Sequence, residues 1–243
     1  FLFCFLALII AWPFDLAGGE DNGVHISVEK GTLVDLSGGA SIKILGKVKY
    51  VDDMIRKHEV AEFTGKGFQL TGDAVSLEKD FSICFWVKGL GNEAWPVLVG
   101  NRLWENINLG FTLGGHSKKI LYSTGNRTRF LIPVNEAAML FDDTWHHVAL
   151  TYSLEEGCKI YLDSRYLGGS ASLGSLKNKT LTFLSAPDEN YGTSASLDDI
   201  RVVKRVLSLK EIAKINKIEP PKIDFNEQAP WPTWMYNKER LGQ

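Results

Sequence analysis

The stretch TWHHVALTYSLEEGCKIYLD, residues 144–163, decides the fold of this chain. Its two halves lie on either side of an acidic Glu-Glu-Gly break, and each half carries apolar side chains at every second position: Val148, Leu150 and Tyr152, then Ile160 and Leu162. This period of two is typical of β-strands with one buried face. The stretch therefore predicts two strands joined by a short turn.

The adjacent residues His146 and His147 suggest a metal site or a catalytic site at first sight. On a strand, however, neighbouring side chains point to opposite faces, so the two imidazoles cannot chelate one ion together. A nucleophilic mechanism would also need a Ser or Cys partner and a third orienting group, which the spacing does not reveal. We therefore expect both histidines to be framework residues.

Short apolar runs separated by glycine-rich and asparagine-rich turns recur along the chain, at residues 60–63, 81–87, 97–99, 109–113, 120–122, 181–184 and 197–203. Runs of this length and spacing predict an antiparallel sandwich or barrel. One helix is expected at residues 209–216, where Ser208 and Glu211 form a capping box in front of an apolar face.

Six segments in order resemble the laminin-G-like jelly-roll domains of the concanavalin A-like lectin/glucanase superfamily: residues 33–39, 60–65, 81–88, 144–152, 159–164 and 197–212. The resemblance covers residues 24–216. It implies an all-β, two-sheet antiparallel jelly-roll sandwich with one short C-terminal helix. The sequence departs from the family pattern at Ser164, where glycine is usual, and at Thr64, where aspartate is frequent.

The two ends of the chain differ in composition from its middle. Residues 1–11 are uninterruptedly apolar but too few to span a bilayer, which favours a signal peptide over residues 1–19. A buried strand or an uncleaved anchor helix is the alternative. Residues 20–218 form the expected jelly-roll domain, and the Pro- and aromatic-rich residues 219–243 form a tail or linker. We expect a secreted, cell-surface or periplasmic protein with no membrane span after processing.

The net charge bears on which partners the chain can bind, and the cysteines bear on whether it carries a disulfide. A formal charge of −2 without basic runs gives no reason to expect nucleic acid as a partner. Cys84 and Cys158 lie in strand-like runs and are expected either as buried free thiols or as a single disulfide.

A calcium site is one possible function of the acidic residues. Asp198 and Asp199 are adjacent near a strand end, with Glu62 as a third candidate ligand, and Ca²⁺ takes its ligands from such oxygens. The resemblance implies that some relatives bind a calcium ion. The alternative is that one aspartate is solvated while the other binds a buried loop or pairs with Arg201 or Arg205.

Catalysis is not expected, although the superfamily includes glucanases. Retaining glycosidases need two carboxyl groups about 5 Å apart. The family's Glu-x-Asp-x-x-Glu motif, which supplies them, does not occur in this sequence. We therefore interpret the chain as a protein that is not an enzyme.

A binding surface is expected where aromatic and hydrogen-bonding side chains gather, because a sugar ring stacks on aromatic faces and bonds through its hydroxyls. The candidate residues are Trp95, Asn101, Arg102, Trp104 and Tyr191. The alternative is that the aromatics are core plugs beneath long loops.

The sequence thus predicts a non-catalytic exported recognition module that binds a glycan or an extracellular protein surface, with calcium as the candidate cofactor. Two other functions stay open. One is an accessory domain of a larger exported hydrolase, such as a phosphoesterase, sulfatase or glycosidase. The other is a structural adhesion domain.

Overall fold

The structure is a computed structural model of the whole chain. It describes residues 23–90, 95–101, 110–116, 119–124, 129–132, 138–170, 179–186 and 191–216. The expected signal peptide (1–19) and tail (219–243) lie outside these ranges. None of the helices in the described part is both long and apolar enough to cross a membrane.

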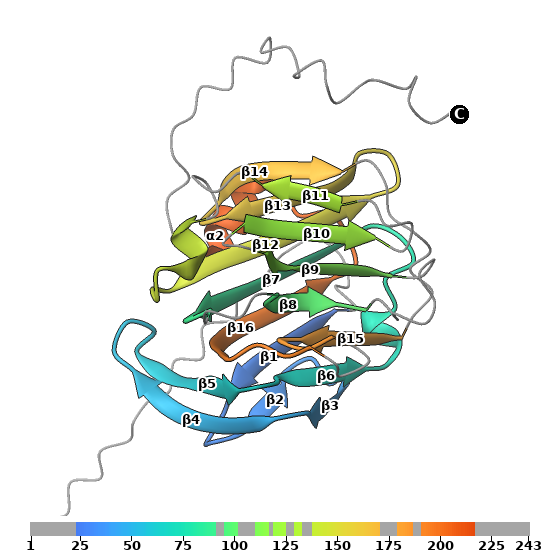
Figure 1. Cartoon of the computed structure of the whole chain (residues 1–243). Coiled ribbons are helices and arrows are strands. Elements are labelled where there is room, and N and C mark those ends of the chain that lie inside the picture. Colours follow the sequence, from blue (N-terminus) through green and yellow to red (C-terminus); the bar gives the residue numbers. More distant parts are fainter. Residues whose placement is uncertain are drawn as a thin grey trace, which may run out of the picture.

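The larger of two antiparallel sheets has nine strands, with the central order β14-β13-β12-β7-β16-β1-β2 and β5 and β4 attached beside β16 (Figure 1). Its strands are β1 (Val24–Val28), β2 (Leu33–Asp35), β4 (Lys47–Asp53), β5 (His58–Thr64), β7 (Phe81–Lys88), β12 (His146–Ser153), β13 (Gly157–Leu162), β14 (Arg165–Ser170) and β16 (Ala195–Val203).

The second sheet has seven strands in the order β11-β10-β9-β8-β15-β6-β3. These strands are β3 (Ser41–Ile44), β6 (Phe68–Thr71), β8 (Val97–Gly100), β9 (Phe111–His116), β10 (Lys119–Thr124), β11 (Arg129–Ile132) and β15 (Thr180–Phe183). Two 3₁₀ turns, at Asp73–Val75 and Ala138–Phe141, and the helix α2 (Leu209–Asn216) complete the described elements. The predicted all-β jelly-roll sandwich is confirmed.

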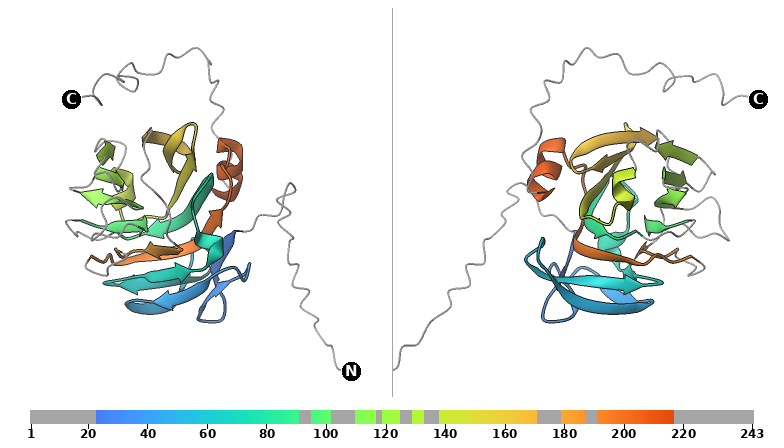
Figure 2. Two further views of the ribbon diagram at one scale, coloured as in Figure 1. Left: turned by 90° about the vertical axis from the view of Figure 1, so that its right-hand side faces the viewer. Right: turned by 60° about the vertical axis from the view of Figure 1, so that its left-hand side comes forward.

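The two sheets face each other, as the turned views in Figure 2 show, and the core lies between them. Aromatic rings from both sheets meet there: Phe68 and Phe183 stack with their centroids 5.1 Å apart, and Phe85 meets Phe183 edge-on at 5.6 Å. All three side chains are fully buried. Burial of so many large apolar side chains between two layers is the main force that holds such a sandwich together.

The stretch that predicted a hairpin forms one. β12 and β13 pair in antiparallel register from Val148–Leu162 to Ser153–Gly157, and β12 also pairs with β7 over seven residues. Gly157 supplies a left-handed backbone (φ 75°) at the start of β13. The hairpin therefore lies inside the larger sheet, between β14 and β7.

Helix α2 covers one patch of the outer face of the larger sheet (Figure 2). Its Ile212 and Ile215 pack with Cys84 and Ala149 of the sheet. The predicted capping box is present, since the amide of Ser208 donates to Glu211 Oε2 over 2.8 Å. The helix begins and ends where the sequence predicts.

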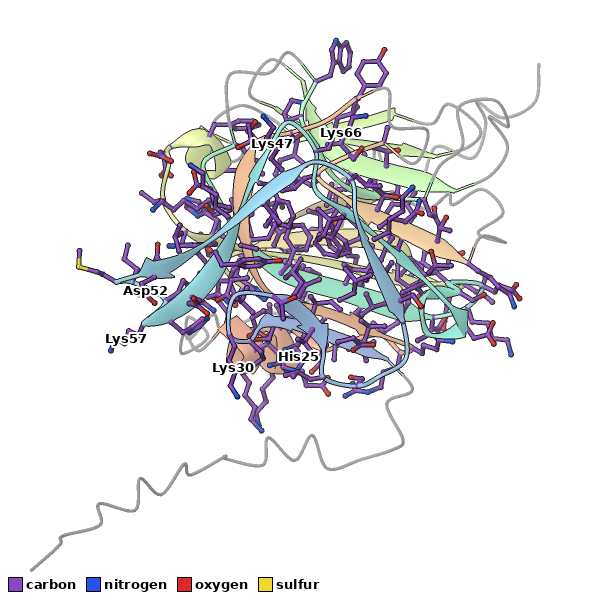
Figure 3. The ribbon with its side chains drawn as sticks, turned by 90° about the horizontal axis from the view of Figure 1, so that it is seen from below. His25, Lys30, Lys47, Asp52, Lys57 and Lys66 are labelled. Atoms are coloured by element: carbon purple, nitrogen blue, oxygen red, sulfur yellow. The ribbon has the colours of Figure 1, made fainter. Side chains whose placement is uncertain are left out.

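The β4–β5 hairpin leaves the sheet at a fork in β16. Residues 195–197 of β16 pair with β5, whereas residues 200–202 pair with β1. In Figure 3 the far end of the hairpin, marked by Asp52 and Lys57, stands apart from Lys47 and Lys66 at its other end. The turn at residues 54–57 is closed by a 2.7 Å hydrogen bond from Lys57 N to Asp53 O and by the side chain of Asp53.

Both cysteines of the described part are buried free thiols, which is the first of the two expected states. Burial raises the pKa of Cys84 and of Cys158 to about 12. Such thiols remain protonated and unreactive at neutral pH.

Candidate functional site

His146, at the start of β12, lies between two carboxylates. Its Nδ1 is 2.7 Å from Asp163 Oδ2 and its Nε2 is 3.0 Å from Asp142 Oδ1. Burial alone would lower the pKa of His146, but these two hydrogen bonds raise it. The hydroxyl of Thr144 is 2.9 Å from Nε2, in an arrangement that resembles an Asp–His–hydroxyl triad.

This arrangement does not provide a base. Both ring nitrogens of His146 face carboxylate oxygens, which only accept and which raise the pKa of the ring, and the protonated ring donates at both positions and has no lone pair for a hydroxyl proton. Thr144 Oγ1 instead donates to Asp142 Oδ1 over 2.7 Å. Asp163 also accepts from the amide of His147 over 2.9 Å, so the group ties β12 to the β13–β14 turn. These contacts agree with the framework role that the sequence predicts for His146.

His147 lies on the opposite face of the strand, next to Trp86, with ring centroids 5.4 Å apart. Its side chain is fully buried, and both ring nitrogens lack a hydrogen-bond partner within the part of the chain that is described. Burial lowers the pKa of His147 to about 4, so the ring is neutral at physiological pH. The two histidines thus have separate surroundings and do not share a ligand.

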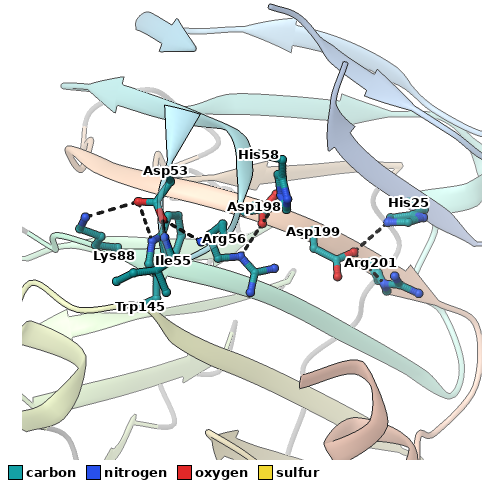
Figure 4. A network of polar contacts seen from close by, with 10 residues as sticks. All are labelled: His25, Asp53, Ile55, Arg56, His58, Lys88, Trp145, Asp198, Asp199 and Arg201. Carbon is teal, nitrogen blue, oxygen red and sulfur yellow. Dashed lines mark hydrogen bonds and ion pairs between the residues drawn. The ribbon is translucent and has the colours of Figure 1, made fainter. Parts of the chain in front are cut away.

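Asp198 is buried on the outer face of the larger sheet and binds two side chains from the β4–β5 hairpin (Figure 4). Its Oδ2 accepts from Arg56 Nε over 2.6 Å and lies 2.9 Å from His58 Nε2. The guanidinium of Arg56 also stacks on Trp86, 4.2 Å from the ring centroid. The charge of Asp198 is therefore compensated by an arginine that has little exposure of its own.

Asp199 points to the same face because β16 has a bulge at this position. Asp198 pairs with Trp86 and Arg201 pairs with Cys84, which leaves one extra residue in β16, and Asp199 has a left-handed backbone (φ 44°). Its Oδ1 lies 2.8 Å from His25 Nε2 and accepts from Arg201 Nε over 2.9 Å. Burial would raise the pKa of Asp199, but the contacts with His25 and Arg201 hold it well below its usual range.

These contacts bear on the predicted calcium site. Both aspartates are already neutralised by guanidinium groups, and Asp199 pairs with Arg201 as the alternative interpretation expected. Glu62 is exposed on β5, opposite Ser196. Within the described ranges, no group of three or more His, Cys, Asp or Glu side chains could hold a metal ion. The arrangement therefore does not fit a calcium ion as it stands, and a site at Asp198, Asp199 and Glu62 stays a prediction.

The sequence reading did not foresee His25, Arg56 and His58 as partners of this acidic pair. Arg56 and His58 are 142 and 140 positions from Asp198, and His25 is 174 positions from Asp199. The spacing of residues within a short segment cannot predict a contact between positions so far apart. The only signal in the sequence was the adjacent pair of aspartates itself.

The structure brings together the two exposed aromatic candidates, Trp95 and Tyr191. Trp95 lies two residues before Val97, whose amide donates to Thr193 Oγ1 over 2.7 Å, and Tyr191 lies two residues before Thr193. Their side chains are 42% and 47% exposed. Both residues are therefore at one end of the sandwich, and we call this pair the aromatic rim.

Of the other ligand candidates, Asn101 lies away from this rim. Asn101 follows the opposite end of β8 and is buried, and its Oδ1 accepts from the amide of Phe111 over 3.0 Å. It closes the base of the loop that it begins. Arg102 and Trp104 lie outside the described residues.

Comparisons with known proteins agree with this fold. A family model, described as the concanavalin A-like lectin/glucanases superfamily, matches residues 63–213. A search of curated proteins finds no match.

Three solved structures similar to this chain are binding domains of toxins. For the binding domain of Paraclostridial Mosquitocidal Protein 1, the TM-score is 0.63 at 14% identity, over 81% of this chain and 52% of that one. For the ligand binding domain of botulinum neurotoxin serotype D in complex with N-acetylneuraminic acid, the TM-score is 0.63 at 17% identity, over 81% of this chain and 51% of that one. For the binding domain of botulinum neurotoxin DC in complex with rat synaptotagmin II, the TM-score is 0.61 at 18% identity, over 82% of this chain and 52% of that one.

The chain thus spans about half the length of these structures, and identities this low demonstrate a shared fold alone. The family model, in contrast, covers well over half of the 243 residues. This chain belongs to the concanavalin A-like lectin/glucanases superfamily.

Proposed function

We propose that this chain is a non-catalytic recognition module of an exported protein, and that it binds a glycan through the aromatic rim of Trp95 and Tyr191. The observation that carries the proposal is the hydrogen bond between Val97 and Thr193, which holds two exposed aromatic residues at one end of the sandwich. Export is proposed from the apolar start of the sequence, in residues 1–11.

Aromatic side chains suit this role because their faces stack on the C–H face of a sugar ring, while polar edges bind its hydroxyls. Proteins also place Tyr and Trp at surfaces that are apolar at one end and wet at the other. Against catalysis, the triad-like histidine His146 is bound by carboxylates at both nitrogens. The described chemistry therefore favours binding.

A cation lies beside the rim and favours an acidic ligand. The turn at Gly65 and Lys66 packs directly on Gly192, since a Cβ built at Gly192 would lie 1.8 Å from Gly65 O and 2.8 Å from Lys66 Cγ. Figure 3 places Lys47 close to Lys66 at this end of the hairpin. The similar neurotoxin domain that was solved with N-acetylneuraminic acid, an acidic sugar, makes sialylated glycans the first class to test.

The test is a glycan array with the full chain and two variants, Trp95→Ala and Tyr191→Ala. Each variant should weaken retention about tenfold or more, because an anchor aromatic side chain at an interface costs at least 1–2 kcal/mol when truncated. Leu154→Ala is the matched control, since Leu154 is an exposed apolar residue on a different turn and should leave retention unchanged.

Unchanged retention by both rim variants would remove the rim as the ligand site. If no glycan is retained but the same two variants lose binding to an extracellular protein, the ligand class changes from glycan to protein and the site remains. Calcium assistance at Asp198, Asp199 and Glu62 is a separate prediction with its own test.

A further inference from the structure

The turn of the β4–β5 hairpin exposes two apolar side chains. Met54 is 95% exposed and Ile55 is 69% exposed, and both lie in the four-residue turn 54–57, which we call the hairpin tip. Scattered exposed apolar residues are ordinary, but two adjacent ones at the end of a projecting hairpin form a continuous apolar tip. The pairing of β5 with β16 stops at Ala61, whereas β4 and β5 stay paired with each other as far as Asp53 and His58.

The tip is nevertheless held in one conformation. Asp53 Oδ1 accepts from the amides of Ile55 and Arg56, both over 2.9 Å, and Asp53 Oδ2 accepts from Trp145 Nε1 over 3.0 Å. Arg56 turns inward and binds Asp198. Because Arg56 turns inward and Asp53 caps the turn, Met54 and Ile55 are exposed on a backbone that is already held in place, and binding through them loses little conformational entropy.

Exposed lysines lie on the side of the molecule that carries the apolar tip. Lys57 is exposed in the tip itself. Lys30 is exposed on the β1–β2 turn, which is joined to β5 by a 3.0 Å hydrogen bond from Gly31 N to Glu59 Oε2, and Figure 3 shows both lysines on this side of the molecule.

We propose that the hairpin tip is a peripheral membrane-binding element, which inserts Met54 and Ile55 into the headgroup region of an anionic lipid surface while Lys57 and Lys30 contact the headgroups. Apolar side chains flanked by lysines are the chemistry of interfacial binding. A lipid surface needs no complementary shape, whereas a stable protein interface needs about 1,000 Å² or more, which two side chains cannot supply. This site is separate from the aromatic rim and does not depend on it.

The experiment is flotation of the full chain with phosphatidylcholine vesicles, with and without phosphatidylserine. Wild-type protein should float with the phosphatidylserine vesicles, and added salt should weaken this binding. The double variant Met54→Ser/Ile55→Ser should bind at least about tenfold more weakly. Lys57→Gln and Lys30→Gln should each weaken binding to the anionic vesicles about fivefold and change binding to the neutral ones little.

Leu154→Ser is the matched control. Leu154 is 73% exposed in the β12–β13 turn, beside Glu155 and Glu156, so it offers a comparable apolar side chain with the opposite charge around it. All the substituted side chains are exposed, and urea unfolding should confirm that each variant folds as the wild type does. The control should float as wild type.

Three results would overturn the proposal. The first is that the wild-type protein floats with neither kind of vesicle. The second is that the double variant floats as the wild type does. The third is that Leu154→Ser loses as much vesicle binding as the double variant. Sedimentation velocity tests one more case. If the wild type is a dimer, the double substitution dissociates it and neither protein binds vesicles, then the partner of the tip is a second copy of the chain.

Discussion

Asn216, the last residue of α2, donates a 3.0 Å hydrogen bond from Nδ2 to Oγ of Ser164, which is 52 positions earlier in the chain. Ser164 is buried and has a left-handed backbone (φ 63°) in the two-residue turn between β13 and β14. Glycine suits that conformation best, and it is the residue that the family pattern usually has there. The serine hydroxyl thus binds the helix to the sheet at a position where the backbone alone would favour glycine.

This contact predicts different effects for two substitutions at Ser164. Ser164→Ala should cost about 1–3 kcal/mol of unfolding free energy, because it leaves Asn216 Nδ2 buried without its acceptor. Ser164→Gly loses the same bond but relieves a left-handed strain of about 1 kcal/mol, so it should be the more stable of the two. Urea unfolding measures both, and equal stabilities would contradict the role given to the backbone.

The ion pair between Arg56 and Asp198 predicts a large loss on truncation. Arg56→Ala should cost about 3 kcal/mol or more, because it leaves the carboxylate of Asp198 buried beside His58 alone. Arg56→Lys should fall in between, because it keeps the charge but loses the planar stacking on Trp86. Lys179→Ala is the control, since it removes an ion pair in which both side chains are exposed, and should change the midpoint of urea unfolding little.

His147 predicts a loss of stability in acid. Burial lowers its pKa from 6.5 to about 4, so between these pH values the unfolded chain binds a proton that the folded chain does not. The free energy of unfolding should therefore fall as the pH drops from 6.5 towards 4, by about 3 kcal/mol in all from this group. His147→Phe should remove that part of the slope in urea unfolding, and parallel pH profiles for the two proteins would contradict it.

His146 predicts the opposite dependence. Despite its burial, the hydrogen bonds to Asp163 and Asp142 raise its pKa, so its stabilising effect is fully present below 6.5 and lost as the pH rises through the raised value. In an NMR titration the His146 ring should titrate above 6.5, and Asp142→Asn should move the midpoint down. A midpoint below 6.5 in the wild type would be inconsistent with the two carboxylate contacts.

The predicted calcium site has a thermal test. An ion bound by Asp198, Asp199 and Glu62 in the folded state would raise the Tm in Ca²⁺ relative to EDTA, and Asp199→Asn would abolish the difference. Because both aspartates already pair with arginines, calcium would have to displace Arg56 or Arg201 to bind. An unchanged Tm would remove calcium from the function.

The elements that the sequence predicted best are those with a local signal. The period of two over residues 144–163 and the capping box at Ser208 and Glu211 are read within a few residues, and both elements form as expected. Strands β1, β4 and β14 were not assigned from the pattern, although Val24, Ile26 and Val28 alternate along β1. Their pairing with β16, β5 and β13 shows where they lie in the sheet, and a short segment by itself does not carry that information.

The candidate site was less accessible from the sequence. Alternation along a strand would place Asp198 and Asp199 on opposite faces, but the bulge in β16 turns both to the outer face, where Arg56 and His25 meet them. For the aromatic candidates, spacing grouped Trp95 with Asn101. The structure separates them by the length of β8 and places Trp95 with Tyr191 instead.

The sequence by itself determined the class of this protein: hydrophobic periodicity, turn residues and six family segments specify a jelly-roll sandwich and leave its two histidines without a shared site. Only the tertiary structure decided which side chains meet. Hydrophobic burial is non-directional and can be read as a pattern along the chain, whereas an ion pair such as Arg56–Asp198 requires two residues 142 positions apart to come within hydrogen-bonding distance. Strand order, one bulge and one projecting hairpin create that proximity, and none of these three features can be predicted from a short segment of the sequence.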